Sequence, residues 1–571
     1  MGVNPATFSS AGQISQHYIP GAYSRRNFVS NEGGGVSSGN ICILGSSDLG
    51  EPQKLLVFDS ANDARGALSG GDGLEAIIQA FAPGNDLTPQ QVGFIRVNDG
   101  LQSSRTLQKS AADSLTVKSY SYGVPMNQVR LKFSAGTVAG SHKIETDYKG
   151  DSYELDDIER KSFLIQYTGA GSAAAMDITA TKLTSTVTAG PGSENLDITL
   201  SEFPTISELV QYINNQAAYT ASVLTGVITE KSIELDMVAA VDIFTTAYTV
   251  KSDYQVVYET LLASNNYLGT VEKEGTDRSV PGYDSDFVYL SGATSGTFTT
   301  TDVTNALEVI EEEDVQLLAT HSNDAAVHIL IKNHCVDMNS VEGRRERQAY
   351  LGGALGEDNA AIASRTLILN SSFVSLCSPG YYQYDDNGDE FLYSPAFLGC
   401  KQIGMVSALA LNNPTTFKTM NVLRWEKDYT RSDKNTLIKA GVLVGAKDQD
   451  GVYITVRSLT TYQGSLLQQN EASIMRESLY QSADLRTRME KALIGTPNLG
   501  NDQLATVDSI FERAIADWNG LGIIVANGSA LYSGYTRRIV ADQIIIEFNT
   551  WNTAPTNFVF ITHNISVLTQ V

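Results

Sequence analysis

The apolar positions of this chain recur with two periods, and together these predict alternating strands and helices. Near the beginning, short apolar runs predict strands at Asn40–Ser47, Lys54–Ser60 and Val92–Asn98. Residues 60–69 suggest a short helix or turn. Leu74–Ala82 spaces its apolar residues three and four apart, which is typical of a helix with one buried face. This β-β-α-β order indicates the start of an α/β domain.

The same alternation returns near Phe287 and continues to about Asn413. Strands are predicted at Phe287–Ala293, Val315–His321, Arg347–Ala354 and Phe373–Pro379, and helices at Thr301–Asp314, Asp324–Asn339, Asp358–Asn370 and Phe397–Asn413. Regular β-α spacing favours a largely parallel sheet with helices on its faces. We expect the N-terminal strands to belong to the same body.

The region between these two α/β parts has a different pattern. From about Leu107 to Thr270, short runs rich in Thr and Val alternate with Gly and Ser turns, and one helix, Thr205–Gln216, interrupts them. We therefore predict a β-rich domain inserted into the α/β body. Beyond Asn421 the chain predicts an α+β region, with strands around an Asp450-Gly451 turn and helices at Ser482–Asn498 and Thr506–Gly522.

The two ends of the chain are strand-like or extended. Residues 1–35 are polar and rich in Ser and Gly, so they cannot bury a core of their own. The C-terminal end has two β-branched and aromatic runs, Ile539–Trp551 and Phe558–Val571, separated by the polar break Asn552–Asn557. A terminal strand exposes N–H and C=O groups that must pair with some sheet. We predict that both ends join one copy of the protein to another.

The residues expected to form these linking strands lie near each end. They are Ala22, Tyr23, Ser24, Arg25, Arg26, Asn27, Phe28 and Val29 in the N-terminal segment, and Phe558, Val559, Phe560, Ile561, Thr562, Ile565, Val567 and Leu568 in the C-terminal segment.

Composition narrows the class of protein only modestly. The 571 residues are 42% hydrophobic and suggest roughly three or four domains. The formal net charge of −24 disfavours nonspecific nucleic-acid binding, which depends on Lys and Arg neutralising phosphates. The four cysteines are far apart, no apolar run approaches the length of a membrane span, and the first residues do not resemble a signal peptide. We expect reduced thiols and folding in a cytoplasm.

Candidate chemical motifs are weak. The glycine-rich Ala67–Ala76 precedes a helix but lacks a phosphate-loop lysine, and the acidic loop Tyr384–Phe391 lacks the glycine and glutamate of a calcium loop. His321, His328 and His334 do not have metal-ligand spacing, and Glu342–Gln348 mixes charges of both signs. We predict no catalytic, cofactor or metal residues. An α/β nucleotide-binding enzyme with an accessory β domain remains the alternative.

Several passages resemble a known family. YIPGAYSRRNFV (Tyr18–Val29) resembles the "PGVY" opening of contractile-tail sheath proteins of bacterial viruses. The passage from Ile41 to Phe81 resembles the passage that follows this opening in those proteins. The sequence resembles most the sheaths of large phages of Gram-positive hosts. It departs from the family after Ser394, where a Pro-Trp passage is absent.

This resemblance implies an α/β and α+β multidomain fold with an inserted β-rich domain and strand-forming arms. The expected parts are an N-terminal arm (1–35), an α/β body (36–106 and 271–420), an inserted β-rich domain (107–270), a C-terminal α+β domain facing a tail tube (421–551) and a C-terminal arm (552–571).

The resemblance also implies a function. Copies would stack as hexameric rings in a helical sheath around a tail tube, bound also to baseplate and tail terminator proteins, without direct nucleic-acid contact or membrane insertion. Contraction would drive the tube through the host envelope. The protein would reside in the virion tail after assembly in the host cytoplasm. Another tail or baseplate component is a further alternative.

Overall fold

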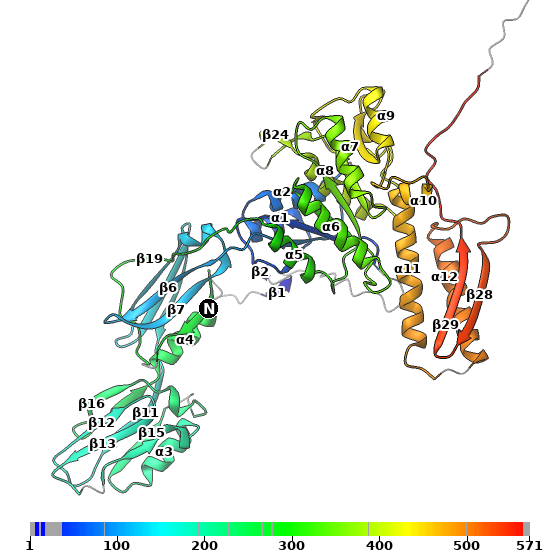
Figure 1. Cartoon of the computed structure of the whole chain (residues 1–571). Coiled ribbons are helices and arrows are strands. Elements are labelled where there is room, and N and C mark those ends of the chain that lie inside the picture. The colour runs from blue at the N-terminus through cyan, green and yellow to red at the C-terminus, as the bar shows by residue number, and fades with distance from the viewer. Residues whose placement is uncertain are drawn as a thin grey trace, which may run out of the picture. The chain divides into compact units, whose positions relative to one another are not determined.

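The computed structural model describes residues 6–10, 13–17 and 37–563, apart from 85, 192–193, 225, 227, 264–266, 276–277, 386–387 and 498–499. The chain divides into two compact units (Figure 1). The first unit comprises Met1–Ser47, Pro52–Asp99 and Thr297–Val571, and the second comprises Asp48–Glu51 and Gly100–Gly296. Each unit has its own buried apolar clusters. The fold is mixed α/β.

The first unit is built on one eight-stranded sheet of order β27-β26-β22-β21-β20-β3-β5-β4. Its strands are β3 (Ile41–Gly45), β4 (Leu55–Phe58), β5 (Val92–Arg96), β20 (Leu317–Thr320), β21 (Gln348–Gly352), β22 (Val374–Ser378), β26 (Val442–Lys447) and β27 (Tyr453–Thr455). All neighbouring pairs from β26 to β5 are parallel, whereas β4 and β27 pair antiparallel at the edges. This confirms the predicted parallel sheet.

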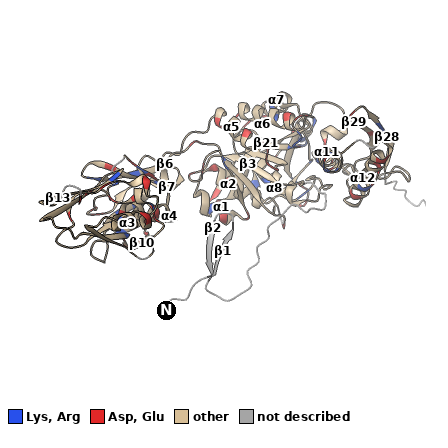
Figure 2. Ribbon diagram, turned by 90° about the horizontal axis from the view of Figure 1, so that it is seen from below, with Lys and Arg blue, Asp and Glu red and all other residues tan. Residues whose placement is uncertain are grey.

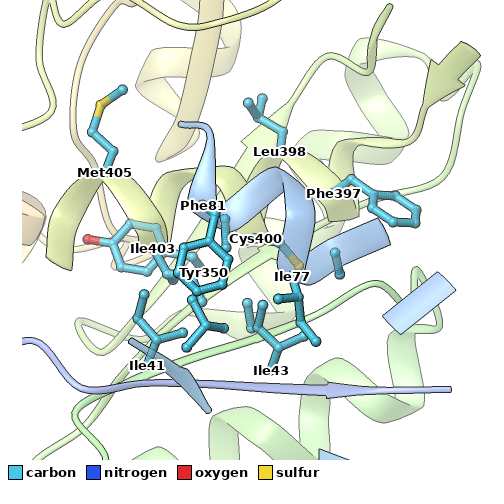
Figure 3. Close-up of a cluster of buried hydrophobic side chains, with 14 of the residues drawn as sticks. Ile41, Ile43, Ile77, Phe81, Tyr350, Phe397, Leu398, Cys400, Ile403 and Met405 are labelled. Carbon is cyan, nitrogen blue, oxygen red and sulfur yellow. The ribbon is translucent and has the colours of Figure 1, made fainter. Parts of the chain in front are cut away.

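The two faces of this sheet bury different side chains of the same strand. In β3, Ile41 and Ile43 pack into one cluster and Cys42 and Leu44 into the other, as the period of two requires. The first cluster lies under α1 (Ala61–Leu68), α2 (Asp72–Phe81) and α8 (Pro395–Ala408), and Figure 3 shows its side chains together. The second lies under α5 (Thr300–Val309), α6 (Ala325–Met338), α7 (Asn359–Leu369) and α9 (Arg431–Lys439).

Several of these helices begin where a capping side chain precedes the apolar pattern. Thr299 and Thr430 form capping boxes with Asp302 and Asp433, and Asp324 accepts the Ala326 amide. A smaller sheet of β23 (Tyr381–Tyr384), β24 (Glu390–Tyr393) and β25 (Arg424–Trp425) lies after β22.

The C-terminal part of the first unit is a helical pair covered by a hairpin. It contains α10 (Leu467–Asn470), α11 (Ala472–Leu493), α12 (Asn501–Gly520), β28 (Tyr532–Val540) and β29 (Gln543–Thr550). Phe511 of α12 stacks on Tyr535 of β28, with ring centroids 4.2 Å apart. The predicted single run Ile539–Trp551 is wrong, because the chain turns at Ala541, whose φ is 56°. Two strands therefore share this stretch.

The second unit contains two β-rich parts, and each part has two sheets and its own buried apolar cluster. One combines the sheets β18-β7-β6 and β10-β9-β8-β19, and the other the sheets β15-β11-β17 and β14-β13-β12-β16. The strands are β6 (Gln102–Lys109), β7 (Ala112–Tyr122), β8 (Val129–Ala135), β9 (His142–Tyr148), β10 (Asp151–Ile158), β11 (Lys161–Tyr167), β12 (Ala173–Ile178), β13 (Lys182–Thr188), β14 (Asp197–Thr199), β15 (Tyr219–Val223), β16 (Val238–Asp242), β17 (Tyr248–Lys251), β18 (Leu268–Lys273) and β19 (Val288–Tyr289).

Two predictions about this region are wrong. The apolar run Phe287–Ala293 does not form a strand of the body sheet; it contributes the short β19, which pairs with β8. A second helix, α4 (Asp253–Ala263), accompanies the expected α3 (Ile206–Asn214). Tyr254, Val257 and Leu261 of α4 are buried at helical spacing, although the residues around them are β-branched and aromatic.

Candidate functional site

Before it leaves the fold, the C-terminal end is held by hydrogen bonds at Trp551–Asn557, which we call the C-terminal root. The Val525 amide donates to the Trp551 carbonyl at 2.8 Å, and the Thr553 amide donates to the Ile523 carbonyl at 3.1 Å. At the end of the root, Asn557 Nδ2 donates to Glu471 Oε1 at 2.9 Å. In Figure 1 the red chain beyond β29 passes close to α10 before it leaves the fold.

Beyond the C-terminal root the chain is apolar and exposed. Phe558, Val559, Phe560 and Ile561 are 68%, 76%, 91% and 87% exposed, and no strand is assigned to residues 558–563. The Phe558 ring lies 5.8 Å from the Arg457 guanidinium. Thr562 is also exposed, while Ile565, Val567 and Leu568 lie outside the described residues. Consecutive large apolar side chains left in water indicate a segment that another surface covers.

The N-terminal linking residues Ala22–Val29 also lie outside the described residues. Nearer the N-terminus, β1 (Ala6–Ser10) and β2 (Gln13–His17) pair with each other as an antiparallel hairpin. The chain then enters the body at Ser38–Asn40, which we call the N-terminal root. Arg476 donates to the Ser38 carbonyl at 3.2 Å, and Ser407 Oγ donates to the Gly39 carbonyl at 2.6 Å.

A sheet with free edges lies in the same unit. β28 and β29 pair only with each other among the described residues, so the outer edge of each strand presents unpaired backbone groups there. One face of this hairpin is covered, because Tyr532, Tyr535 and Phe548 pack on Phe511 of α12. The hairpin is therefore held in place while its edges stay open.

Buried ionisable groups surround the two roots. Glu471 is fully buried, and Arg457 Nη2 lies 2.5 Å from its Oε1. Burial raises the pKa of Glu471, although Arg457 and Asn557 oppose this effect. Burial also raises the pKa of Glu477 to about 9, which the Thr553 amide and the Arg476 charge only partly offset. Burial lowers the pKa of Arg476 to about 10.

The glycine-rich loop is packed rather than open. It lies at the carboxyl end of β3, between β5 and β20, where doubly wound folds bind nucleotides. Here the Gly73 amide donates to the Ser46 carbonyl at 2.7 Å, and a Cβ on Gly73 would lie 2.6 Å from the Phe94 ring. Asp72 and Glu75 occupy the first turn of α2, where they would repel a phosphate. The loop therefore packs a helix against a strand.

The three histidines have separate partners. His328 Nε2 contacts the Ser322 carbonyl at 2.9 Å, His334 Nε2 accepts from Arg347 at 2.6 Å, and His321 Nε2 accepts the Ser46 amide at 3.0 Å. Burial lowers the pKa of His328 to about 4 and that of His334 to about 3. These neutral rings act as hydrogen-bonding groups of the core.

The remaining motifs also have structural partners. The four cysteines are buried free thiols, and burial raises the pKa of Cys42 and Cys335 to about 12. In the acidic loop, the Asp389 amide donates to Asp385 Oδ1 at 2.9 Å, which closes the β23–β24 connection.

The mixed-charge run Glu342–Gln348 is tied to α11. Arg486 of α11 contacts Glu346 with two hydrogen bonds of 2.5 and 2.6 Å. In the second unit, the acidic group Glu230, Glu234 and Glu259 includes two carboxylates paired with Arg160.

Charge and hydropathy add two observations. Figure 2 shows basic and acidic positions interspersed along the ribbon. None of the helices in the described ranges combines the length and apolar character needed to cross a membrane.

Sequence reasoning missed the residues that hold the roots. Glu471, Arg476 and Gln481 are charged or polar and lie in or next to α11, yet all three are at least nine-tenths buried. The predicted helix begins at Ser482, whereas α11 begins at Ala472, so all three residues lay outside the predicted helix and only their burial distinguishes them.

Comparison with known proteins gives consistent results. Residues 296–461 match the family profile of the phage tail sheath protein central domain. The chain is 28% identical over 526 residues to the tail sheath protein of Bacillus phage SP01, covering 87% of each chain. It is 24% identical to the tail sheath protein of Staphylococcus phage Twort, covering 73% of this chain and 75% of the relative.

A solved structure shares the fold. The sheath tail protein from Desulfitobacterium hafniense superimposes with a TM-score of 0.54 at 13% sequence identity, and the match covers 93% of this chain and 100% of that one.

Proposed function

The chain is a phage tail sheath protein, a structural subunit of a contractile tail, and we propose that its copies are joined through their chain ends. In this proposal Phe558–Val571 of one copy adds a strand to a sheet of a neighbouring copy, and Ala22–Val29 does the same in the other direction. The two free edges of the β28–β29 hairpin supply one acceptor for each segment. Such strand addition suits a homopolymer because every copy both donates and accepts.

The exposed apolar segment at Phe558–Ile561 is the observation that carries the proposal. Burying each of these side chains stabilises by roughly 1.5–3 kcal/mol, or about 6–12 kcal/mol for the four. Fixing their backbone costs about 1–2 kcal/mol per residue. For the four residues this cost is about 4–8 kcal/mol, so burial roughly offsets it and backbone hydrogen bonds add to the gain. The same side chains in a lone copy would remain in water.

Larger assembly features are consistent with the same linkage. We propose that the copies form hexameric rings stacked as a helical sheath around a tail tube, with the baseplate at one end and a tail terminator protein at the other. Within the expected part 421–551, β26 and β27 belong to the large sheet, so the helices α11 and α12 with their hairpin would face the tube. The β-rich Gly100–Gly296, which contains the expected 107–270, would be an insertion in the α/β body. Contraction would repack rigid bodies while the linking segments stay paired, and would drive the tube through the host envelope. Assembly would take place in the host cytoplasm.

Removing the C-terminal segment tests the linkage. Deleting Phe558–Val571 should leave a folded, soluble chain, because the C-terminal root remains, and should abolish tube formation in negative-stain micrographs. A milder variant, Phe558→Ser with Phe560→Ser, should raise the concentration needed for polymerisation at least tenfold. Val341→Ser is the matched control, because Val341 is 91% exposed like Phe560 but lies in a loop after α6. Tubes of normal length from the truncated chain would refute the proposal.

A further inference from the structure

One helix contacts both chain-end roots. Arg476 in α11 donates to the Ser38 carbonyl of the N-terminal root. Gln481 in the same helix donates to Asn552 Oδ1 at 3.2 Å, and Glu471, the residue just before the helix, accepts from Asn557. Glu471 and Arg476 are five residues apart, which is about 8 Å along a helix axis. Both ends of the chain therefore leave the fold from one short stretch.

The charges that make these contacts are costly to bury. Arg476 is only 7% exposed, and its hydrogen bonds run to the main-chain carbonyls of Ser38 and Leu409. Glu471 is fully buried and is balanced by Arg457 and Asn557. A buried charge destabilises a protein unless partners compensate it, and an apolar residue of similar size often serves stability better. Stability alone therefore does not explain charged residues at these positions.

Further contacts hold α11 in a fixed position in the fold. Arg486 binds Glu346, two residues before β21, so α11 is tied to the body sheet. Asp484 accepts from Trp518 of α12 at 2.9 Å and from Arg488 at 2.9 Å, so α11 is tied to the second helix as well. Its polar groups at the two roots consequently have defined positions.

We propose that α11 and its preceding residue Glu471 are the positioning element for both linking segments. Arg476 sets the direction in which the N-terminal segment leaves, and the Glu471–Asn557 hydrogen bond sets the direction of the C-terminal segment. The geometry of a copy's links to its neighbours on both sides is then determined by one helix. This inference rests on the proposed linkage through the chain ends.

Two single substitutions test it in the full-length chain. Arg476→Lys keeps the charge but loses the planar fork that reaches Ser38. Asn557→Ala removes the donor to Glu471. Hydrogen–deuterium exchange should increase about tenfold at residues 37–44 in the first variant and at residues 551–557 in the second, which is the change expected for loss of one hydrogen bond to a charged group. Exchange in α12 should not change. Arg513→Lys and Asn519→Ala, at exposed positions of α12, are the controls.

The twist between rings of the assembled tube is the second measurement. It should not change if these residues only stabilise the fold of a single copy. Helical reconstruction of tubes from Arg476→Lys and Asn557→Ala should show a broader distribution of twist between rings than tubes of the parent chain. Parent-like exchange and parent-like twist in both variants would overturn the inference. Should Arg476→Lys reduce the soluble yield, Asn557→Ala decides alone.

Truncation of the C-terminal segment separates the proposed linkage from the role of α11. If chains lacking Phe558–Val571 still form tubes, the proposed linkage is wrong. If truncation abolishes tubes but the two substitutions leave exchange and twist unchanged, only the role of α11 is wrong.

Discussion

Glu477 shows how a single buried group can impose a pH dependence on this protein. Its side chain is fully buried in α11, and burial raises its pKa from 4.5 to about 9. Between about pH 5 and pH 9 the folded chain therefore holds a proton that the unfolded chain has released. Stability attributable to this group is greatest below the unfolded pKa and falls as the pH rises through that window.

Replacing this carboxyl with an amide should remove the effect. We expect Glu477→Gln to raise the free energy of unfolding of its unit by roughly 1–3 kcal/mol at pH 8.5, because the amide does not have to take up a proton when the chain folds. At pH 4.5 the difference should nearly vanish. Thermal melting of both chains at the two pH values measures this. Glu312→Gln is the control, because the Glu312 side chain is 94% exposed. A gap that widens toward low pH would contradict the assignment.

At the level of single residues, residue type marks the chain-end segments as candidates for linkage, but it does not reveal the groups that hold their roots. Phe558 and Phe560 stand out by residue type, and they are exposed as expected of a segment awaiting a partner. Glu471 and Arg476 resemble surface residues, since burial depends on which elements pack against α11. That packing joins residues more than 400 positions apart, such as Arg476 and Ser38. Local pattern carries no information about such contacts.

At the level of elements, the close approach of α8 to α2 depends on a glycine. A Cβ added at Gly404 of α8 would lie 1.9 Å from the Ala80 carbonyl oxygen of α2. The two helices could accept it only by moving apart and loosening the cluster between them and the sheet. Figure 3 shows the neighbouring side chains Ile403 and Cys400 in that cluster.

We therefore expect Gly404→Ala to destabilise the first unit by roughly 1–3 kcal/mol or more, as overpacking does. Gly520→Ala is the matched control, because no atom lies within 4 Å of a Cβ added near the end of α12. The control should be neutral or slightly stabilising, since alanine favours helices. Thermal melting of the two variants compares them directly. Equal melting temperatures would show that the helix contact tolerates a methyl group.

The predicted strands and helices were accurate where the periodic pattern of apolar residues was long and unbroken. The strands β3 and β5 and the helices α2, α3, α6 and α7 all lie where the apolar period placed them. The errors have a common cause, because the strand propensity of a segment does not specify which strand it pairs with. Phe287–Ala293 is strand-like but pairs with β8, and the Val540–Gln543 stretch turns back because Ala541 adopts a left-handed conformation.

At the level of the whole molecule, the long segment of the second unit, Gly100–Gly296, begins and ends at neighbouring points. Leu101 donates to the Thr294 carbonyl at 3.0 Å, and Ser104 and Ser291 exchange hydrogen bonds of 2.8 and 3.0 Å. Strands β3 and β5 come before this segment in the chain and β20 comes after it, yet β3 pairs with both β5 and β20 in one sheet. The first unit therefore has a complete sheet without contributions from Gly100–Gly296.

We expect that Gly100–Gly296 can be replaced by a short Gly/Ser linker with the first unit still folded. Cores on both faces of the large sheet would remain, so circular dichroism should retain helical signal and a cooperative melt. Because both roots and the β28–β29 hairpin also remain, tubes should still form. A control deletion of equal length through β20, β21 and β22 should abolish folding. An insoluble product from the linker chain alone would contradict the expectation.

The two roots have a mechanical consequence. If each copy is pulled through both of its ends, tension enters at Asn557 and leaves at Ser38, and the load path between these points runs through Glu471–Arg476 at the start of α11. The covalent chain also carries load from Ser38 into β3, and Ser407 of α8 holds Gly39, so the parallel sheet shares the force. In a row of linked copies each body would therefore behave as one stiff unit with α11, and bending would concentrate in the segments between copies.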